Sequence, residues 1–138
     1  MPDAFRFPVR VYYEDTDAGG VVYHANYLRF AERARTEFLR AAGIEQREMR
    51  DADGFAFVVR RCSIDFRAPA YLDDALEVVT RITGVRGAAL EAVQEVVRAG
   101  EADPLVVLEL VIAGVNGRGR PARLPQNVRD LAGGFVPA

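Results

Sequence analysis

The stretch NYLRFAERARTEFLRAAG, residues 26–43, decides the fold because it carries the longest helical pattern of the sequence. Its apolar side chains recur at helical spacing, and charged residues fill the opposite face. Asn26 is a suitable N-cap and Gly43 a natural stop. The pattern therefore predicts a helix over residues 27–42, about 24 Å long at 1.5 Å per residue. The side chains predicted to be buried are Tyr27, Phe30, Ala31, Ala34, Phe38, Ala41 and Ala42.

Alternation of apolar and polar residues predicts five long strands around this helix. Pro8 places the first strand at an edge or at a bulge. The phase of the alternation slips at residues 60–61, which predicts a bulge there. The last strand is nearly all apolar, so we expect it to be covered on both faces or buried against a partner. The five predicted strands are residues 5–13, 55–67, 75–85, 88–98 and 105–115.

The order of these elements predicts an α+β fold. One strand precedes the helix and four strands follow it in a meander, so we expect a curved five-stranded antiparallel sheet around the long central helix. Residues 126–132 are expected to add a short helix, and residues 132–138 to fray. With 138 residues and no linker, the chain is predicted to be a single domain over residues 1–138.

Composition excludes several classes of function. The net charge is −2, which disfavours a nucleic-acid-binding protein. All 18 basic residues are arginine, so Schiff-base chemistry is excluded. One histidine and one cysteine, Cys62, make a zinc site unfavourable, and no other cofactor is indicated. Without a secretion signal or an apolar run of about 18–20 residues, the sequence predicts a soluble cytoplasmic protein with no transmembrane segment.

The loop before the helix carries most of the chemical information. Residues 14–17 include three carboxylates, two glycines follow, and the only histidine, His24, lies next to the helix start. Free N–H groups at a helix start favour a developing oxyanion. A nearby carboxylate could attack the polarised carbonyl or direct water at it. On spacing alone, a solvated acidic turn and a structural histidine remain alternative interpretations.

A resemblance favours the catalytic interpretation. Residues 13–25, YEDTDAGGVVYHA, and residues 32–37, ERARTE, closely resemble acyl-CoA thioesterases of the 4-hydroxybenzoyl-CoA thioesterase family. The nearest branch is the one associated with the Tol-Pal cell-envelope system, and a weaker likeness extends over residues 6–130. The resemblance implies the hotdog fold, a catalytic role for Asp17, and a backbone N–H of His24 that polarises the thioester carbonyl.

The predicted function is therefore hydrolysis of an acyl-CoA thioester to a free acid and coenzyme A. Asp17 is either the nucleophile or the general base, and the sequence leaves this choice open. Predicted substrate contacts are Tyr27 in the acyl pocket, and Arg86, Arg60 and Arg61 on the phosphates of coenzyme A. An acyl carrier protein is the alternative carrier of the acyl group. We expect a homodimer or a homotetramer, because a single sheet leaves an open edge and apolar outer surface.

Two other functions compete with this prediction. A hotdog dehydratase or hydratase acting on acyl thioesters would use His24 as its base, paired with Glu32 or Glu37. A non-catalytic module that binds acyl-CoA or an acyl carrier protein would make the carboxylate at the helix start incidental. The Asp-Ala-Gly-Gly motif argues against the first of these.

Overall fold

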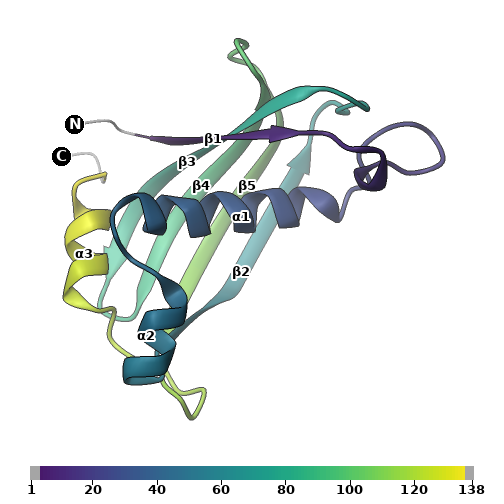
Figure 1. Ribbon diagram of the computed structural model, residues 1–138. Coiled ribbons are helices and arrows are strands. Elements are labelled where there is room, and N and C mark those ends of the chain that lie inside the picture. The colour runs from purple at the N-terminus through teal and green to yellow at the C-terminus, as the bar shows by residue number, and fades with distance from the viewer. Residues whose placement is uncertain (1–3, 136–138) are drawn as a thin grey trace.

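Five strands form one antiparallel sheet that curves around α1 in the computed structural model, which describes residues 4–135 (Figure 1). This arrangement confirms the predicted α+β architecture. The strands are β1 (Phe5–Arg10), β2 (Ala56–Phe66), β3 (Ala75–Arg86), β4 (Ala89–Arg98) and β5 (Pro104–Val115). The helices are α1 (Asn26–Ala41), α2 (Gln46–Asp53) and α3 (Gln126–Gly133), with a 3-10 turn, η1 (Tyr13–Asp15), before α1.

The strand order is β1-β3-β4-β5-β2. The predicted meander of all four strands after α1 is therefore wrong at one connection, the one between β2 and β3. β3, β4 and β5 form the expected meander, but β2 pairs with β5 at the far edge of the sheet. The chain therefore crosses the sheet between β2 and β3 instead of making a hairpin. Alternation of side chains predicts that a segment is a strand, but it carries no information about which neighbour the strand pairs with.

Two local irregularities of the strands agree with the sequence. Pro8 lies in β1, which is an edge strand, as expected for a residue without an N–H to donate. The register between β2 and β5 shifts between Val59 and Arg61, so the predicted bulge is confirmed. β1 is shorter than predicted because the chain turns into η1 at Tyr13.

The ends of α1 differ in part from the prediction. Asn26 is not the cap: it is the first helical residue, and its side chain donates to the backbone carbonyl of Asp15 at 2.9 Å. Ala41 and Ala42 are exposed, because the buried stripe ends at Leu39. At Gly43 the helix stops as predicted: its φ is +80°, and the N–H of Ile44 bonds the carbonyl of Leu39 at 2.9 Å.

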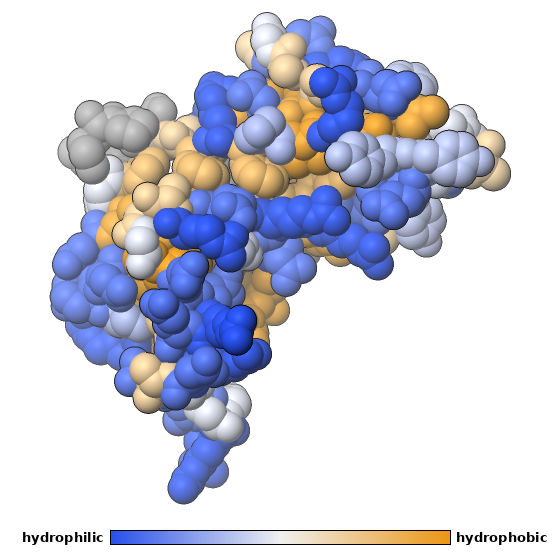
Figure 2. Space-filling model, in the orientation of Figure 1, coloured by the Kyte–Doolittle hydropathy of each residue, from blue (hydrophilic) through white to orange (hydrophobic). Residues whose placement is uncertain are grey.

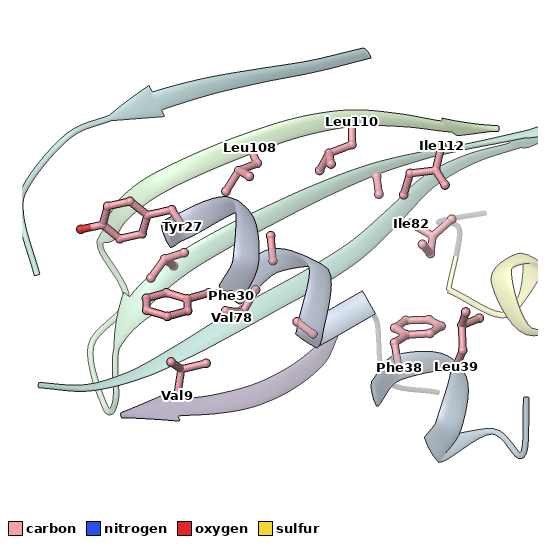
Figure 3. Close-up of a cluster of buried hydrophobic side chains, with 14 of the residues drawn as sticks. Val9, Tyr27, Phe30, Phe38, Leu39, Val78, Ile82, Leu108, Leu110 and Ile112 are labelled. Carbon is pink, nitrogen blue, oxygen red and sulfur yellow. The ribbon is translucent and has the colours of Figure 1, made fainter. Parts of the chain in front are cut away.

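The core lies between α1 and the sheet. Figure 3 shows Phe30, Phe38 and Leu39 of α1 pointing toward side chains of β3 and β5. Two polar side chains are buried there, Gln94 of β4 and Thr80 of β3. Gln94 donates to the carbonyl of Ala31 and to the hydroxyl of Thr80, both at 3.0 Å. Arg35 then donates to the Gln94 side-chain carbonyl at 2.9 Å, and burial lowers the pKa of its guanidinium. This network fixes α1 on the sheet.

The two short helices differ in how well they could be predicted. α2 was not predicted, because it has no buried residue and therefore no apolar period. α3 confirms the short helix expected at residues 126–132. Within residues 132–138, for which fraying is expected, Ala132 is buried and the Phe135 ring packs 4.8 Å from that of Phe38. Residues 136–138 lie outside the described residues. Among residues 4–135, no helix combines the length and apolar character needed to cross a membrane.

Candidate active site

The loop between β1 and α1 folds back on itself as a small hairpin. Thr16 and Val22 form an antiparallel bridge, and the N–H of Asp17 bonds the carbonyl of Val21 at 2.9 Å. Gly20 closes the turn with a φ of +79°, a backbone conformation that favours glycine. Gly20 therefore lets the chain turn back toward the start of α1 after Asp17.

Asp17 lies at the bend of this hairpin with an exposed side chain. Its Oδ1 accepts one hydrogen bond, from the N–H of Gly19 at 2.8 Å. That bond fixes the carboxylate, and the exposure leaves its second oxygen accessible to a substrate or to water. Asp17 therefore has the access that a nucleophile or a general base requires.

Asp15, two residues earlier, is buried and structural. Its carboxylate accepts the N–H of Tyr12 at 2.8 Å. Its backbone carbonyl accepts the N–H of Tyr23 at 2.9 Å, besides the side chain of Asn26. Asp15 thus ties the hairpin to the helix start. Because its carboxylate is buried and bonded, we no longer count it among the candidate catalytic carboxylates. Over residues 4–135, no group of three or more His, Cys, Asp or Glu side chains is placed to hold a metal ion.

His24 lies in the turn that leads into α1, with its side chain exposed. Ala25 is the N-cap of α1, and its methyl side chain makes no capping hydrogen bond. Among the described residues, no acceptor bonds the backbone N–H of His24 or Ala25. These two N–H groups lie just before the start of a 16-residue helix, an end that favours nearby negative charge. The imidazole packs edge-on to Phe66 of β2, with 6.3 Å between ring centroids.

Tyr27, predicted to contact substrate, lies in the core with 3% of its surface exposed. Its hydroxyl accepts the N–H of Ala70 at 3.2 Å, and its ring packs against Phe30 and Phe66. Burial raises the pKa of the phenol. This environment favours a structural role, in which Tyr27 joins α1 to the segment after β2.

The three predicted arginines are not near Asp17 within one chain. Ala75, the first residue of β3, pairs with Arg10 just before the loop that carries Asp17. Arg86 is the last residue of β3, so it lies about 35 Å from Ala75 at 3.3 Å per residue. Arg86 is exposed and pairs with Glu91 at 3.0 Å. Arg60 and Arg61 are exposed at the bulge of β2. Asp17 and His24 thus lie on the same loop between β1 and α1, and the predicted arginines lie on other elements.

Sequence reasoning missed the apolar surface beside His24. Leu28 of α1 and Phe66 of β2 are 44% and 50% exposed. Farther along the helix, a cavity of about 150 Å³ lies between α1, β2 and α3. The only signal in the sequence was Leu28, an apolar residue outside the buried stripe of its helix.

Comparison with known proteins identifies the family. The sequence model of the thioesterase-like superfamily matches residues 11–131. Acyl-CoA thioester hydrolase YbgC of Escherichia coli is 55% identical over 108 residues, which cover 75% of this chain and 80% of that protein. Acyl-CoA thioesterase YbgC of Haemophilus influenzae is 51% identical over 98 residues, covering 71% and 72%. The chain belongs to the thioesterase-like superfamily, so the predicted family and enzyme class are confirmed.

Solved structures agree with this assignment. A probable thioesterase from Bartonella henselae superposes with a TM-score of 0.83 at 40% identity, over 88% of this chain and 99% of that one. The 1,4-dihydroxy-2-naphthoyl-CoA thioesterase from Synechocystis gives a TM-score of 0.86 at 27% identity, over 94% and 95%. The hotdog fold implied by the resemblance is therefore confirmed.

Proposed function

We propose that this chain is an acyl-CoA thioesterase, which hydrolyses its substrate to a free acid and coenzyme A. The observation that carries the proposal is the pair of free N–H groups at His24 and Ala25, on the same loop as the exposed carboxylate of Asp17. Named acyl-CoA thioesterases among the relatives support the same substrate class.

In the proposed reaction, the carbonyl oxygen of the thioester accepts the backbone N–H of His24, which stabilises the negative charge that develops there. Asp17 either attacks the carbonyl carbon or removes a proton from a water molecule that attacks it. Direct attack expels the thiolate and leaves a mixed anhydride, which water then hydrolyses. Since thiols have a pKa near 8.5, the thiolate leaves without a general acid. One carboxylate, one donor and one water therefore suffice.

The test is steady-state hydrolysis of a panel of acyl-CoAs, followed by release of free thiol. Absorbance of the enoyl thioester is followed in parallel. Thiol release with no change in enoyl absorbance is the expected result. A change in enoyl absorbance without thiol release would favour a dehydratase or hydratase. Tight binding without either signal would favour a non-catalytic binding module. Running the panel with acyl carrier protein as carrier decides between the two carriers.

Replacing His24 by alanine should reduce activity only in part. The donor assigned to residue 24 is its backbone N–H, which remains after the side chain is truncated. We expect kcat/KM to fall by less than the roughly 10²-fold minimum typical of losing a general base. An inactivation as deep as that of an Asp17 variant would show that the imidazole itself takes part in the chemistry.

Metal chelation should leave the activity unchanged, because the proposed chemistry needs no Lewis acid. Asp17 must also be free of metal in order to attack a carbonyl or accept a proton. The measurement is acyl-CoA hydrolysis after dialysis against EDTA, with and without added Mg²⁺, Mn²⁺ or Zn²⁺. If activity is lost on chelation and restored by one metal, the carboxylates of the acidic loop bind that metal, and the proposed metal-free mechanism is wrong.

The chain should form a homodimer or a homotetramer. β2 is an edge strand, and its Val58 and Val59 are exposed. The outer face of β5 adds Val107 and Val111, which are half-buried. Such edges and patches favour pairing with another copy. Light scattering should return two or four times the 15.2 kDa of one chain. A stable species of 15.2 kDa at micromolar concentration would contradict this.

A second copy would also account for the separation of the arginines from Asp17. We propose that Arg86, Arg60 or Arg61 of one copy binds coenzyme A phosphates at the loop of another, since a guanidinium matches phosphate geometry. A cytoplasmic location, an association with the Tol-Pal system and a single domain over residues 1–138 are likewise proposals.

A further inference from the structure

We propose that Arg98 is a positioning residue for the thioesterase reaction, because it holds the crossover segment on which the hairpin of Asp17 rests. This inference rests on the proposed thioesterase function and adds a residue that acts through others. Arg98 is the last residue of β4. The crossover segment consists of residues 67–74, which connect the end of β2 to the start of β3.

The crossover segment supports the hairpin directly. The N–H of Val22 bonds the carbonyl of Ala70 at 2.9 Å, and Val21 forms an antiparallel bridge with Tyr71. The carbonyl of Val21 in turn accepts the N–H of Asp17 at 2.9 Å. Figure 1 shows the loop before α1 and the connection between β2 and β3 at the same end of the sheet. A shift of the crossover segment therefore moves the part of the hairpin that fixes the backbone of Asp17.

The crossover segment also holds the start of the same loop. Val11 donates its N–H to the carbonyl of Asp74 and accepts the N–H of Asp73, both at 3.0 Å. The backbone of Asp73 is left-handed, with a φ of +70°. This conformation costs free energy in a residue other than glycine and persists only where the surroundings impose it. The segment therefore depends on contacts that keep it in place.

Apolar packing supplies few of these contacts. Of residues 67–74, all of which the structure describes, Ala70 alone is buried. Tyr71 and Leu72 are 49% and 42% exposed. Figure 2 shows hydrophobic surface exposed beside hydrophilic side chains at this end of the molecule, at the upper right of the view. Polar contacts therefore determine the position of the segment.

Arg98 contacts the crossover segment at three points. Its Nη2 donates to the carbonyl of Pro69 at 2.8 Å, and its Nε donates to the carboxylate of Asp74 at 3.3 Å. Its Cζ lies 5.9 Å from the centroid of the Tyr71 ring, a distance at which a cation is attracted to the ring face. The carboxylate of Asp74 also accepts the N–H of Tyr71 at 2.8 Å. These contacts lie on both sides of Ala70, so they fix the carbonyl that supports the hairpin.

The ion pair of Arg81 with Glu95 is a matched control. Its side chains are 39% and 26% exposed, against 33% and 24% for Arg98 and Asp74. Arg81 lies six residues beyond Ala75 in β3, about 20 Å from the end of the crossover segment. Loss of either ion pair should therefore change the midpoint of thermal unfolding by the same small amount.

The experiment compares Arg98→Met with Arg81→Met in the full-length protein, because methionine keeps a long side chain without donors or charge. For Arg98→Met, kcat for acyl-CoA hydrolysis should fall by about 10- to 100-fold with KM nearly unchanged, since misplacing a catalytic group by about 1 Å can cost about 10²-fold. Arg98→Lys keeps the charge but lacks the planar fork that reaches both Pro69 and Asp74, so it should restore kcat in part. Arg81→Met should keep the kcat and KM of the wild type.

Hydrogen exchange gives a second readout that needs no turnover. The amides of Asp17 and Val22 should exchange about tenfold faster in Arg98→Met, as expected when local opening loses the cost of one hydrogen bond. In Arg81→Met they should exchange at the wild-type rate. If Arg98→Met does not fold, Asp74→Asn replaces it, because it removes the ion pair and its side-chain oxygen can still accept the N–H of Tyr71.

Three results would overturn the inference and leave the thioesterase proposal standing. The first is faster exchange with a wild-type kcat, and the second is a lower kcat without faster exchange. The third is an equal loss of kcat in Arg98→Met and Arg81→Met. If the wild type hydrolyses no acyl-CoA, the thioesterase proposal fails, and the exchange rates alone decide whether Arg98 holds the hairpin.

Discussion

Replacing Asp17 by asparagine should lower kcat/KM for acyl-CoA hydrolysis by a factor of about 10²–10⁴, the usual cost of losing a general base. Loss of a nucleophile would cost more. Asparagine is nearly isosteric, and its side-chain oxygen can still accept the N–H of Gly19, so the hairpin should keep its shape. The effect is therefore expected on turnover and not on the free energy of unfolding. Free-thiol release and thermal unfolding measure the two quantities separately.

Asp15→Asn is the matched control for this variant. Its oxygen can still accept the N–H of Tyr12, and Asp15 is buried, so activity should stay close to that of the wild type. A folded Asp17→Asn variant that hydrolyses acyl-CoA within a few-fold of the wild type would show that Asp17 is not the catalytic carboxylate. Glu14, Glu32 and Glu37 would then be tested in the same way.

Replacing Phe30 by alanine should lower the free energy of unfolding by about 3–5 kcal/mol, the range for truncating a buried phenylalanine. Phe30 is 1% exposed and lies between α1 and the sheet, with its ring 6.1 Å from that of Tyr27 (Figure 3). Truncation leaves a cavity that the surrounding strands cannot close. A loss of this size is a large part of the 5–15 kcal/mol that stabilises a typical domain.

Urea unfolding followed by circular dichroism measures this loss. Tyr13→Ala is the control, because Tyr13 is 83% exposed and such substitutions usually change stability by less than about 0.5 kcal/mol. If Phe30→Ala unfolds at the same urea concentration as Tyr13→Ala, α1 is not the centre of the core.

The strands and α1 could be predicted because their apolar patterns are long and regular. The slip at residues 60–61 even located the bulge of β2. The pairing of β2 with β5 could not be predicted, because a strand's pattern does not identify its partner. α2 was missed for a different reason: it buries no side chain, so it leaves no apolar period. The exposure of Ala41 and Ala42 shows that helical spacing alone does not fix where burial ends.

The candidate site was predictable as a segment but not residue by residue. Sequence placed Asp15 and Asp17 in one acidic loop, and only the fold separates them, because Asp15 is turned inward to bond Tyr12. Asn26 fits the pattern of a cap, yet it is the first helical residue and its side chain donates to the backbone carbonyl of Asp15. The exposure of Leu28 and Phe66 beside His24 depends on where α1 rests on the sheet, and this is set by packing that no local pattern describes.

The most direct test of the central claim is the stoichiometry of products formed from one acyl-CoA by the purified wild-type protein. Free thiol and free acid are measured in the same reaction mixture at several protein concentrations. The proposed mechanism predicts equal amounts of the two products, formed at a rate proportional to protein concentration. An acyl-CoA that is bound but recovered intact, or converted without release of thiol, would contradict it.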